Sequence, residues 1–66
     1  MSFKEWLYTE LDNDGVIDPS DVDIDELDKD FLLSCTDLEE DDLDNYEEQF
    51  REHCRRRGET PVMDLD

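Results

Sequence analysis

Apolar side chains recur at the start of the chain with the spacing of a helix. The pattern i, i+3, i+4, i+8 places four of them on one face: Phe3, Trp6, Leu7 and Leu11. Ser2 and Glu5 have the form of a capping box, with a hydroxyl before the helix and a carboxylate three residues later. We therefore expect a short helix over about 3–11, ended by the breaker Asn13-Asp14-Gly15.

Two patterns compete after Pro19. Asp18 and Pro19 suit the cap and the first position of a new helical turn. The alternation over residues 22–25 is typical of a strand, whereas Ile24, Leu27 and Phe31 keep a helical spacing over a longer window. We favour a second helix over about 23–34.

The clearest helical pattern fills the second half of the chain. Thr36 and Glu39 form another capping box, and Gly58 suits the left-handed residue that follows a helix end. The expected apolar face carries Leu43, Tyr46, Phe50 and Cys54, with Leu38 at its margin. Early acids and the bases Arg55, Arg56 and Arg57 complement the helix dipole. Three ion pairs are expected to add a few tenths of a kcal/mol each: Glu47–Arg51, Glu48–Arg51 and Glu52–Arg56.

These patterns predict an all-α fold, a small bundle of about three short helices. We expect one helical domain over 1–58 and a flexible C-terminal tail over 59–66, where no period remains. A domain of this length buries only about 60% of the surface of its unfolded chain, so its core is marginal.

Charge changes this picture more than any motif. The 66 residues hold 23 Asp and Glu against 6 Lys and Arg, a formal net charge of −17. Eighteen of the acids lie between Glu10 and Glu48 with Lys29 as the only base, so this segment carries the whole net charge. Such a chain cannot neutralise phosphates, which argues against direct binding to nucleic acid or to an anionic membrane.

Catalytic and zinc chemistry find little support in the sequence. The only histidine is His53, and no nucleophile can be paired with it. Cys35, His53 and Cys54 lack the spacing of a zinc site. We interpret both cysteines as small reduced core residues and predict neither an enzyme nor a cofactor. No signal peptide is recognised, so a cytoplasmic location is expected.

Residues 10–21 offer calcium binding as an alternative. Oxygen-bearing residues alternate, Gly15 allows a sharp turn and Ile17 is an apolar anchor. The segment resembles an EF-hand or dockerin loop, but opens on Glu10 instead of Asp and closes on Asp21. The resemblance implies the ligands Glu10, Asp12, Asp14, Val16, Asp18 and Asp21. Because EF-hands work in pairs and no second loop exists, we rank a calcium module second.

The acidic surface is the leading candidate for function. At 100° per residue, one polar stripe of the third helix carries Asp37, Glu40, Asp41, Asp44 and Glu48. Neighbouring charges about 5–6 Å apart approach the spacing of phosphates along a nucleic-acid strand. If the second helix packs beside the third, a second row follows, with Asp21, Asp25 and Asp28. The competing interpretation is a solvated helix face, yet a net −17 costs a small domain stability through self-repulsion.

Short length, extreme acidity, a helical pattern and no catalytic motif resemble the small acidic inhibitors that phages and mobile elements encode against host DNA-handling enzymes. The resemblance is one of class, with no shared motif. It implies a DNA mimic in the basic groove of a host nuclease, restriction or CRISPR effector, topoisomerase, gyrase or polymerase, acting in the host cytoplasm if the chain is phage-encoded.

We also expect a homodimer, because the apolar residues are more than one small three-helix body can easily cover. The residues assigned to it are Phe3, Trp6, Leu7, Tyr46 and Phe50, with Leu11 and Leu43 on the same faces. A third interpretation is an acidic adaptor whose last helix docks by its apolar side on a protein partner.

Overall fold

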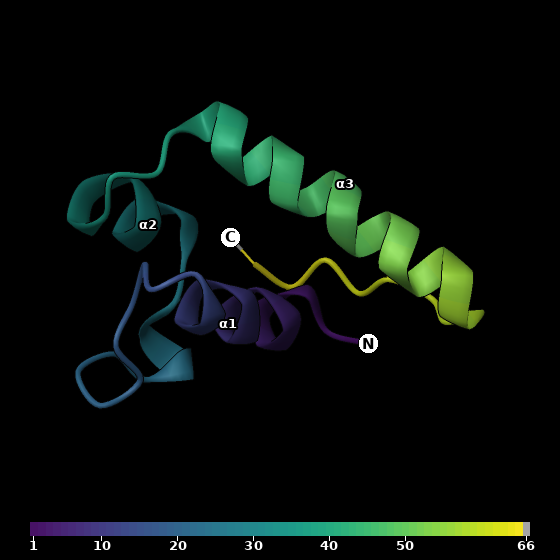
Figure 1. Cartoon of the computed structure of the whole chain (residues 1–66), viewed down its shortest axis with the longest axis horizontal. Helices are drawn as coiled ribbons and strands as arrows, with labels where there is room; N and C mark the ends of the chain where they lie inside the picture. The colour runs from purple at the N-terminus through teal and green to yellow at the C-terminus, as the bar shows by residue number, and fades with distance from the viewer. Residues whose placement is uncertain (66) are drawn as a thin grey trace.

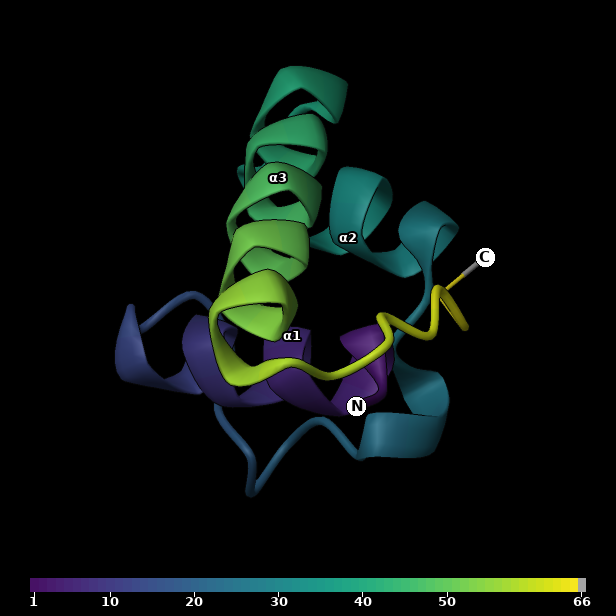
Figure 2. The same cartoon turned by 90° about the vertical axis from the view of Figure 1, so that its right-hand side faces the viewer.

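Three α-helices and one turn of 3-10 helix make up the computed structural model over the residues that it describes, 1–65. These are α1 (Phe3–Asn13), the turn η1 (Ile24–Glu26), α2 (Lys29–Cys35) and α3 (Glu40–Arg57). Figures 1 and 2 show α3 crossing one side of α1, with α2 beside the first part of α3. The prediction of a small all-α bundle is confirmed.

The start of α1 is the one that the sequence predicts. Ser2 Oγ accepts the N–H of Glu5 at 3.3 Å. The helix continues two residues beyond the predicted end, and Asp14 N still donates to Glu10 O at 2.9 Å. Gly15 then adopts a φ of 74°, a left-handed conformation that glycine reaches without strain.

The helix predicted over 23–34 is wrong in its first half. Only residues 24–26 are helical there, as one 3-10 turn, and α2 begins at Lys29. Asp28 accounts for the break, because its side chain accepts the N–H of Phe31 at 2.7 Å as an N-cap and its backbone is extended. Leu27, also extended, is 1% exposed, so its burial outweighs the local helical spacing.

The last helix, α3, keeps its predicted end but starts later than predicted. Thr36 Oγ1 donates to Leu32 O and accepts from Leu38 N, so it follows the end of α2 instead of opening α3. The N-cap is Glu39, whose N–H donates to the Asp42 carboxylate at 3.0 Å. At the other end Gly58 is left-handed, and the N–H groups of residues 58 and 59 close a Schellman motif on residues 55 and 54.

The core forms mainly where α1 meets α3. Its rings pack closely: the centroid of Phe50 lies 5.1 Å from that of Phe3 and 5.5 Å from that of Trp6. The predicted apolar faces of the first and third helices are buried at most positions, with Trp6 and Tyr46 half-buried, whereas Ile24 and Phe31 of the predicted second helix are only partly buried. The buried residues are Phe3, Leu7, Leu11, Ile17, Leu27, Leu32, Leu43, Phe50 and Cys54. Cys54 is a buried free thiol, but the expectation that Cys35 is a core residue is wrong, because that thiol is exposed at the end of α2.

The segment expected as a flexible tail, 59–66, returns along α1 in its described part, 59–65. Phe3 N donates to Val62 O at 2.8 Å, and Val62 N donates to Met1 O at 3.0 Å. Asp64 accepts hydrogen bonds from Ser2 Oγ at 2.5 Å and from Lys4 N at 2.9 Å. A carboxylate from the far end of the sequence thus helps to cap α1, and Leu65 packs on the core.

Candidate functional site

Opposite charges occupy the two ends of α3. The acid-rich part ends at Glu48, and the last two turns carry Arg51, Arg55, Arg56 and Arg57 with Glu52 as the one acid among them. Within residues 1–65 the ion pairs are Arg56–Glu52 at 3.0 Å and Arg57–Glu59 at 2.8 Å, both at the arginine end. None of the 18 acids between residues 10 and 48 is paired with a base of the described chain. Their field is therefore uncompensated.

The five acids assigned to the third helix, called the α3 stripe below, are all exposed. The stripe comprises Asp37, Glu40, Asp41, Asp44 and Glu48. Four lie on α3, whereas Asp37 precedes its N-cap and stands on the connecting segment. Glu40 and Asp41 fall in the first turn, where their charges complement the helix dipole. These two side chains therefore serve the helix as well as the surface.

Only part of the second row lies beside the first. In Figures 1 and 2 the loop 19–22 and the turn η1 lie on the far side of α1 from α3, whereas Asp14 reaches α3, where it accepts the hydroxyl of Tyr46 at 2.8 Å. Asp21 and Asp25 are exposed on that segment, away from the α3 stripe. Asp28 lies at the start of α2, where its carboxylate is already engaged as a cap. The acidic surface thus has two parts: the α3 stripe with the start of α2 beside it, where Lys29 lies near Asp44, and the loop acids on the far side of α1.

The calcium-loop residues are arranged as a helix end followed by a turn. Glu10 and Asp12 lie on α1, and Val16 is half-buried. Asp14 accepts the hydroxyl of Tyr46 at 2.8 Å, and Asp18 accepts the N–H of Ser20 at 2.9 Å. Asp21 ends that turn, donating its N–H to Asp18 O. Residues 1–65 contain no group of three or more His, Cys, Asp or Glu placed to hold a metal ion.

Two tyrosines hold the segment 14–22 against the helices. Burial, followed by the hydrogen bond to Asp14 and its charge, raises the pKa of Tyr46 to about 12. Tyr8 donates to Val22 O at 2.5 Å, and burial together with the charge of Asp23 raises its pKa above the usual value. Both phenols therefore keep their protons, which these hydrogen bonds require.

The residues assigned to self-association serve the fold of a single chain. Phe3, Leu7 and Phe50 are at most 1% exposed. Trp6 and Tyr46 are half-buried, and their ring centroids lie 6.4 Å apart in an edge-on contact. One chain therefore covers most of the apolar surface that the sequence suggested was in excess.

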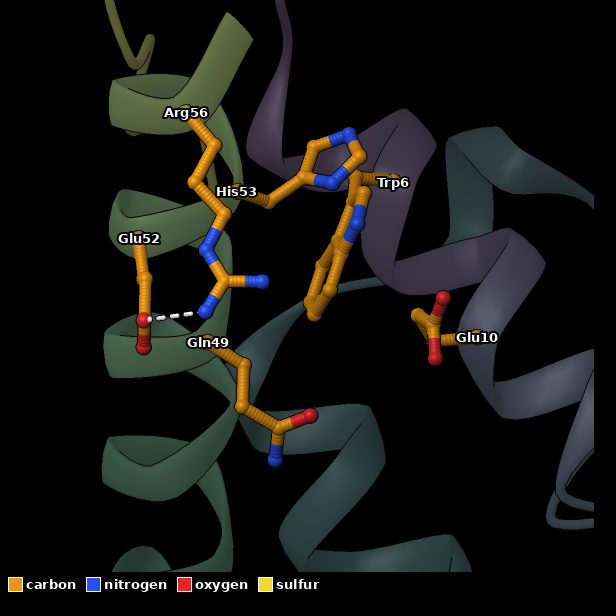
Figure 3. Close-up of a pocket in the computed structure, with 6 residues that line it drawn as sticks. All are labelled: Trp6, Glu10, Gln49, Glu52, His53 and Arg56. Atoms are coloured by element: carbon orange, nitrogen blue, oxygen red, sulfur yellow. Dashed lines mark hydrogen bonds and ion pairs between the residues drawn. The ribbon is translucent and has the colours of Figure 1, made fainter.

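A hollow between α1 and α3 belongs to no motif singled out in the sequence. Its volume is about 330 Å³, and it is lined by Trp6, Glu10, Gln49, Glu52, His53 and Arg56. In Figure 3 the Trp6 ring lies between the Glu10 carboxylate of α1 and the Arg56 guanidinium of α3, and Glu52 lies on the outer side of α3, where it pairs with Arg56. The signal in the sequence is the i,i+4 spacing of Trp6 and Glu10, matched by spacings of three and four among the α3 residues. We call this feature the Trp6 hollow.

No protein-family model, curated protein or solved structure matches the chain. Among the helices of residues 1–65, none is long and apolar enough to cross a lipid bilayer.

Proposed function

We propose that this chain is a DNA mimic, an inhibitor that occupies the basic groove of a nucleic-acid-binding protein and keeps DNA out. The observation that carries the proposal is the exposed, uncompensated charge of residues 10–48. Sixteen of their 18 acids are exposed, and none has an ion-pair partner within residues 1–65. The carboxylates are thus available to the bases of another protein without first breaking an internal ion pair.

The size of the molecule supports the same proposal. Over the 32 Å of its longest dimension, a duplex would carry about 19 phosphates at one charge per ~1.7 Å. The chain carries a net −17. A groove that has evolved to neutralise a phosphate backbone therefore meets a comparable charge over a comparable length.

The α3 stripe is the stronger of the two acidic parts. Four of its five carboxylates stand on a single 18-residue helix that the core holds through Leu43 and Phe50. Of the other acids, Asp28 is engaged as a cap, and Asp21 and Asp25 belong to the segment that Figures 1 and 2 show on the far side of α1. We therefore assign the first contact with the partner to the stripe, because a helix that is already folded loses little backbone freedom on binding.

Inhibition would work by competition. Carboxylates of the stripe would pair with the Lys and Arg side chains that otherwise hold phosphates, and the charge would steer a fast, salt-sensitive association. The arginine end of α3, residues 51–57, would stay at the rim of the groove, where Arg56 and Arg57 are already paired with Glu52 and Glu59. The bound chain would thus have a direction, with the acidic end of α3 inserted first.

The test begins with capture on the immobilised chain from a nuclease-treated bacterial lysate. Each captured protein is then purified, and its binding to duplex DNA is measured with increasing amounts of the chain. We expect the apparent affinity for DNA to fall, and the competition to weaken as salt rises. Poly-aspartate of equal total charge is the control. If it competes as well as the chain, or if the captured proteins bind no DNA, the proposal is wrong.

A further inference from the structure

The Trp6 hollow combines an aromatic face with a free carboxylate. Trp6 and Glu10 are one helical turn apart on α1, and Gln49 faces them from α3. In Figure 3 the Glu10 carboxylate lies on one side of the Trp6 ring and the Arg56 guanidinium on the other. The two sides of the ring therefore meet groups of opposite charge.

Only one of these two charges lacks an ion-pair partner within residues 1–65. Arg56 donates from Nη2 to Glu52 Oε1 at 3.0 Å, so the wall formed by α3 is compensated within itself. Glu10 forms no ion pair within residues 1–65. The uncompensated charge of the hollow is negative, and it lies beside the face of the only tryptophan in the chain.

The indole is also held in position. Its ring centroid lies 5.5 Å from that of Phe50, 6.2 Å from that of Phe3 and 6.3 Å from that of His53. A ring fixed by the core presents its free face at little entropic cost when something binds to it.

An aromatic face beside a carboxylate favours the binding of a flat cation. A guanidinium stacks on an aromatic face and presents a fork of N–H donors that matches a carboxylate. An ammonium is a compact, strongly hydrated charge and makes a poorer stack. The Gln49 side-chain carbonyl offers a further acceptor on the opposite wall.

We propose that the Trp6 hollow receives an arginine side chain of the basic protein partner, with its guanidinium stacked on Trp6 and paired with Glu10. The class of that partner rests on the proposed function, whereas the chemistry of the hollow does not. Trp and Arg are the residues most enriched at the energetic centres of protein interfaces. The hollow would thus add a specific contact to a surface that otherwise acts through its total charge.

The experiment uses Trp6 itself as the reporter, since no other tryptophan contributes fluorescence or an indole N–H signal. The full chain is titrated with N-acetyl-arginine amide and, separately, with N-acetyl-lysine amide at constant ionic strength. We expect a saturable change in the Trp6 signals with an affinity about fivefold higher for the arginine probe.

Variants distinguish binding in the hollow from attraction by the overall negative charge of the chain. Glu10→Gln should weaken the arginine probe about fivefold, and Glu10→Asp should restore part of that loss. Asp30→Asn removes the same charge from an exposed site outside the hollow and should change the affinity less than twofold. Equal affinities for the two probes, or equal losses in Glu10→Gln and Asp30→Asn, would overturn the proposal.

Failure of this inference is distinguishable from failure of the proposed function. If the chain displaces DNA from its partner but the probes are not discriminated, the hollow is not an arginine site and mimicry stands. If the arginine probe binds as expected but no captured protein loses DNA, mimicry falls and an arginine-recognising surface remains.

Discussion

The contact between α1 and α3 is apolar, whereas the surface around it is acidic. Every buried residue of the described chain is apolar, and no charged or polar residue is buried there. The acids of residues 10–48, in contrast, are almost all exposed and lack ion pairs. A chain with a net −17 can fold because its charges stay hydrated while a small apolar contact holds the helices together.

This division implies that stability and binding depend on different residues and can be changed separately. The acids contribute to stability mainly through caps and helix dipoles, as Asp28 and Asp42 do. The buried residues contribute nothing that a partner can touch. Variants on each side of the division test it.

Neutralising the α3 stripe should have the largest effect. The change is Asp37→Asn, Glu40→Gln, Asp41→Asn, Asp44→Asn and Glu48→Gln together. Affinity for the partner should fall by several orders of magnitude, since each stranded Lys or Arg in the groove costs on the order of 2–5 kcal/mol. Unfolding free energy should stay within about 1 kcal/mol, because relief of repulsion offsets the lost dipole interactions of Glu40 and Asp41.

A matched variant removes the same charge from the rest of the surface. It neutralises five exposed acids that are not on α3: Asp12, Asp21, Asp23, Asp25 and Glu26. DNA-competition assays and urea unfolding are measured for both variants. Equal losses of affinity would contradict the assignment to the α3 stripe and leave only the total charge.

Phe50→Ala should destabilise the fold by about 3–5 kcal/mol, because it empties the middle of the α1–α3 contact. A domain this small has little stability to spare, so helix content should fall. Phe50→Leu keeps most of the volume and should cost far less. Far-UV circular dichroism with urea unfolding measures both. A folded Phe50→Ala variant of unchanged stability would show that the core lies elsewhere.

Asp64→Asn should cost about 1 kcal/mol at neutral pH by weakening the cap on α1. Burial alone would raise the pKa of Asp64, but its hydrogen bonds from Ser2 and Lys4 outweigh this and leave the pKa below its usual value of 3.8. The stabilisation is therefore present above that pH and is lost as pH falls through the lower, folded-state pKa.

Urea unfolding at neutral and at strongly acidic pH tests this dependence, with Asp25→Asn as an exposed control without a cap. The difference between wild type and Asp64→Asn should vanish in acid. A difference that persists there would mean that the carboxylate charge is not what holds residues 59–65.

The faces of the helices and several caps could be predicted because they depend on neighbours in the sequence. Ser2 and Gly58 are examples, and both act as predicted. The late start of α2 could not be predicted from the sequence, because it depends on the burial of Leu27 by other elements. Asp64 helps to cap α1 by accepting a hydrogen bond from Ser2, 62 residues away, and no local sequence pattern predicts such a contact.

The same distinction applies to the candidate site. Exposure of the α3 stripe follows from helical spacing, which the sequence supplies. The separation of Asp21 and Asp25 from that stripe depends on the path of residues 14–26 around α1. The Trp6 hollow likewise needs the crossing of α1 and α3, because its walls come from both helices.

Self-association should be a smaller effect. Since Phe3, Leu7 and Phe50 are buried within one chain, only Trp6 and Tyr46 remain partly available. We expect a monomer at tens of micromolar in low salt and a shift toward a dimer as salt screens the repulsion between two bodies of −17. Sedimentation equilibrium measures this. A tight dimer in low salt would require a contact surface other than these residues.

Calcium should have the smallest effect. Asp14 and Asp18 already accept hydrogen bonds, and Glu10 and Asp12 lie on a helix and not in an open loop. Micromolar calcium added after a chelator should leave the far-UV circular dichroism unchanged, with any binding near the millimolar range. A large gain in helix at micromolar calcium would restore the EF-hand or dockerin interpretation.

Because the two thiols differ in exposure, their rates of alkylation can report how often the core opens. Cys35 is exposed and should react with an alkylating reagent at once, whereas Cys54 is 0% exposed and can react only when α3 leaves α1. The slow second alkylation therefore reports openings of the core under native conditions, without denaturant. Measured with and without a bound partner, that rate would show whether occupation of the acidic surface tightens the contact beneath it.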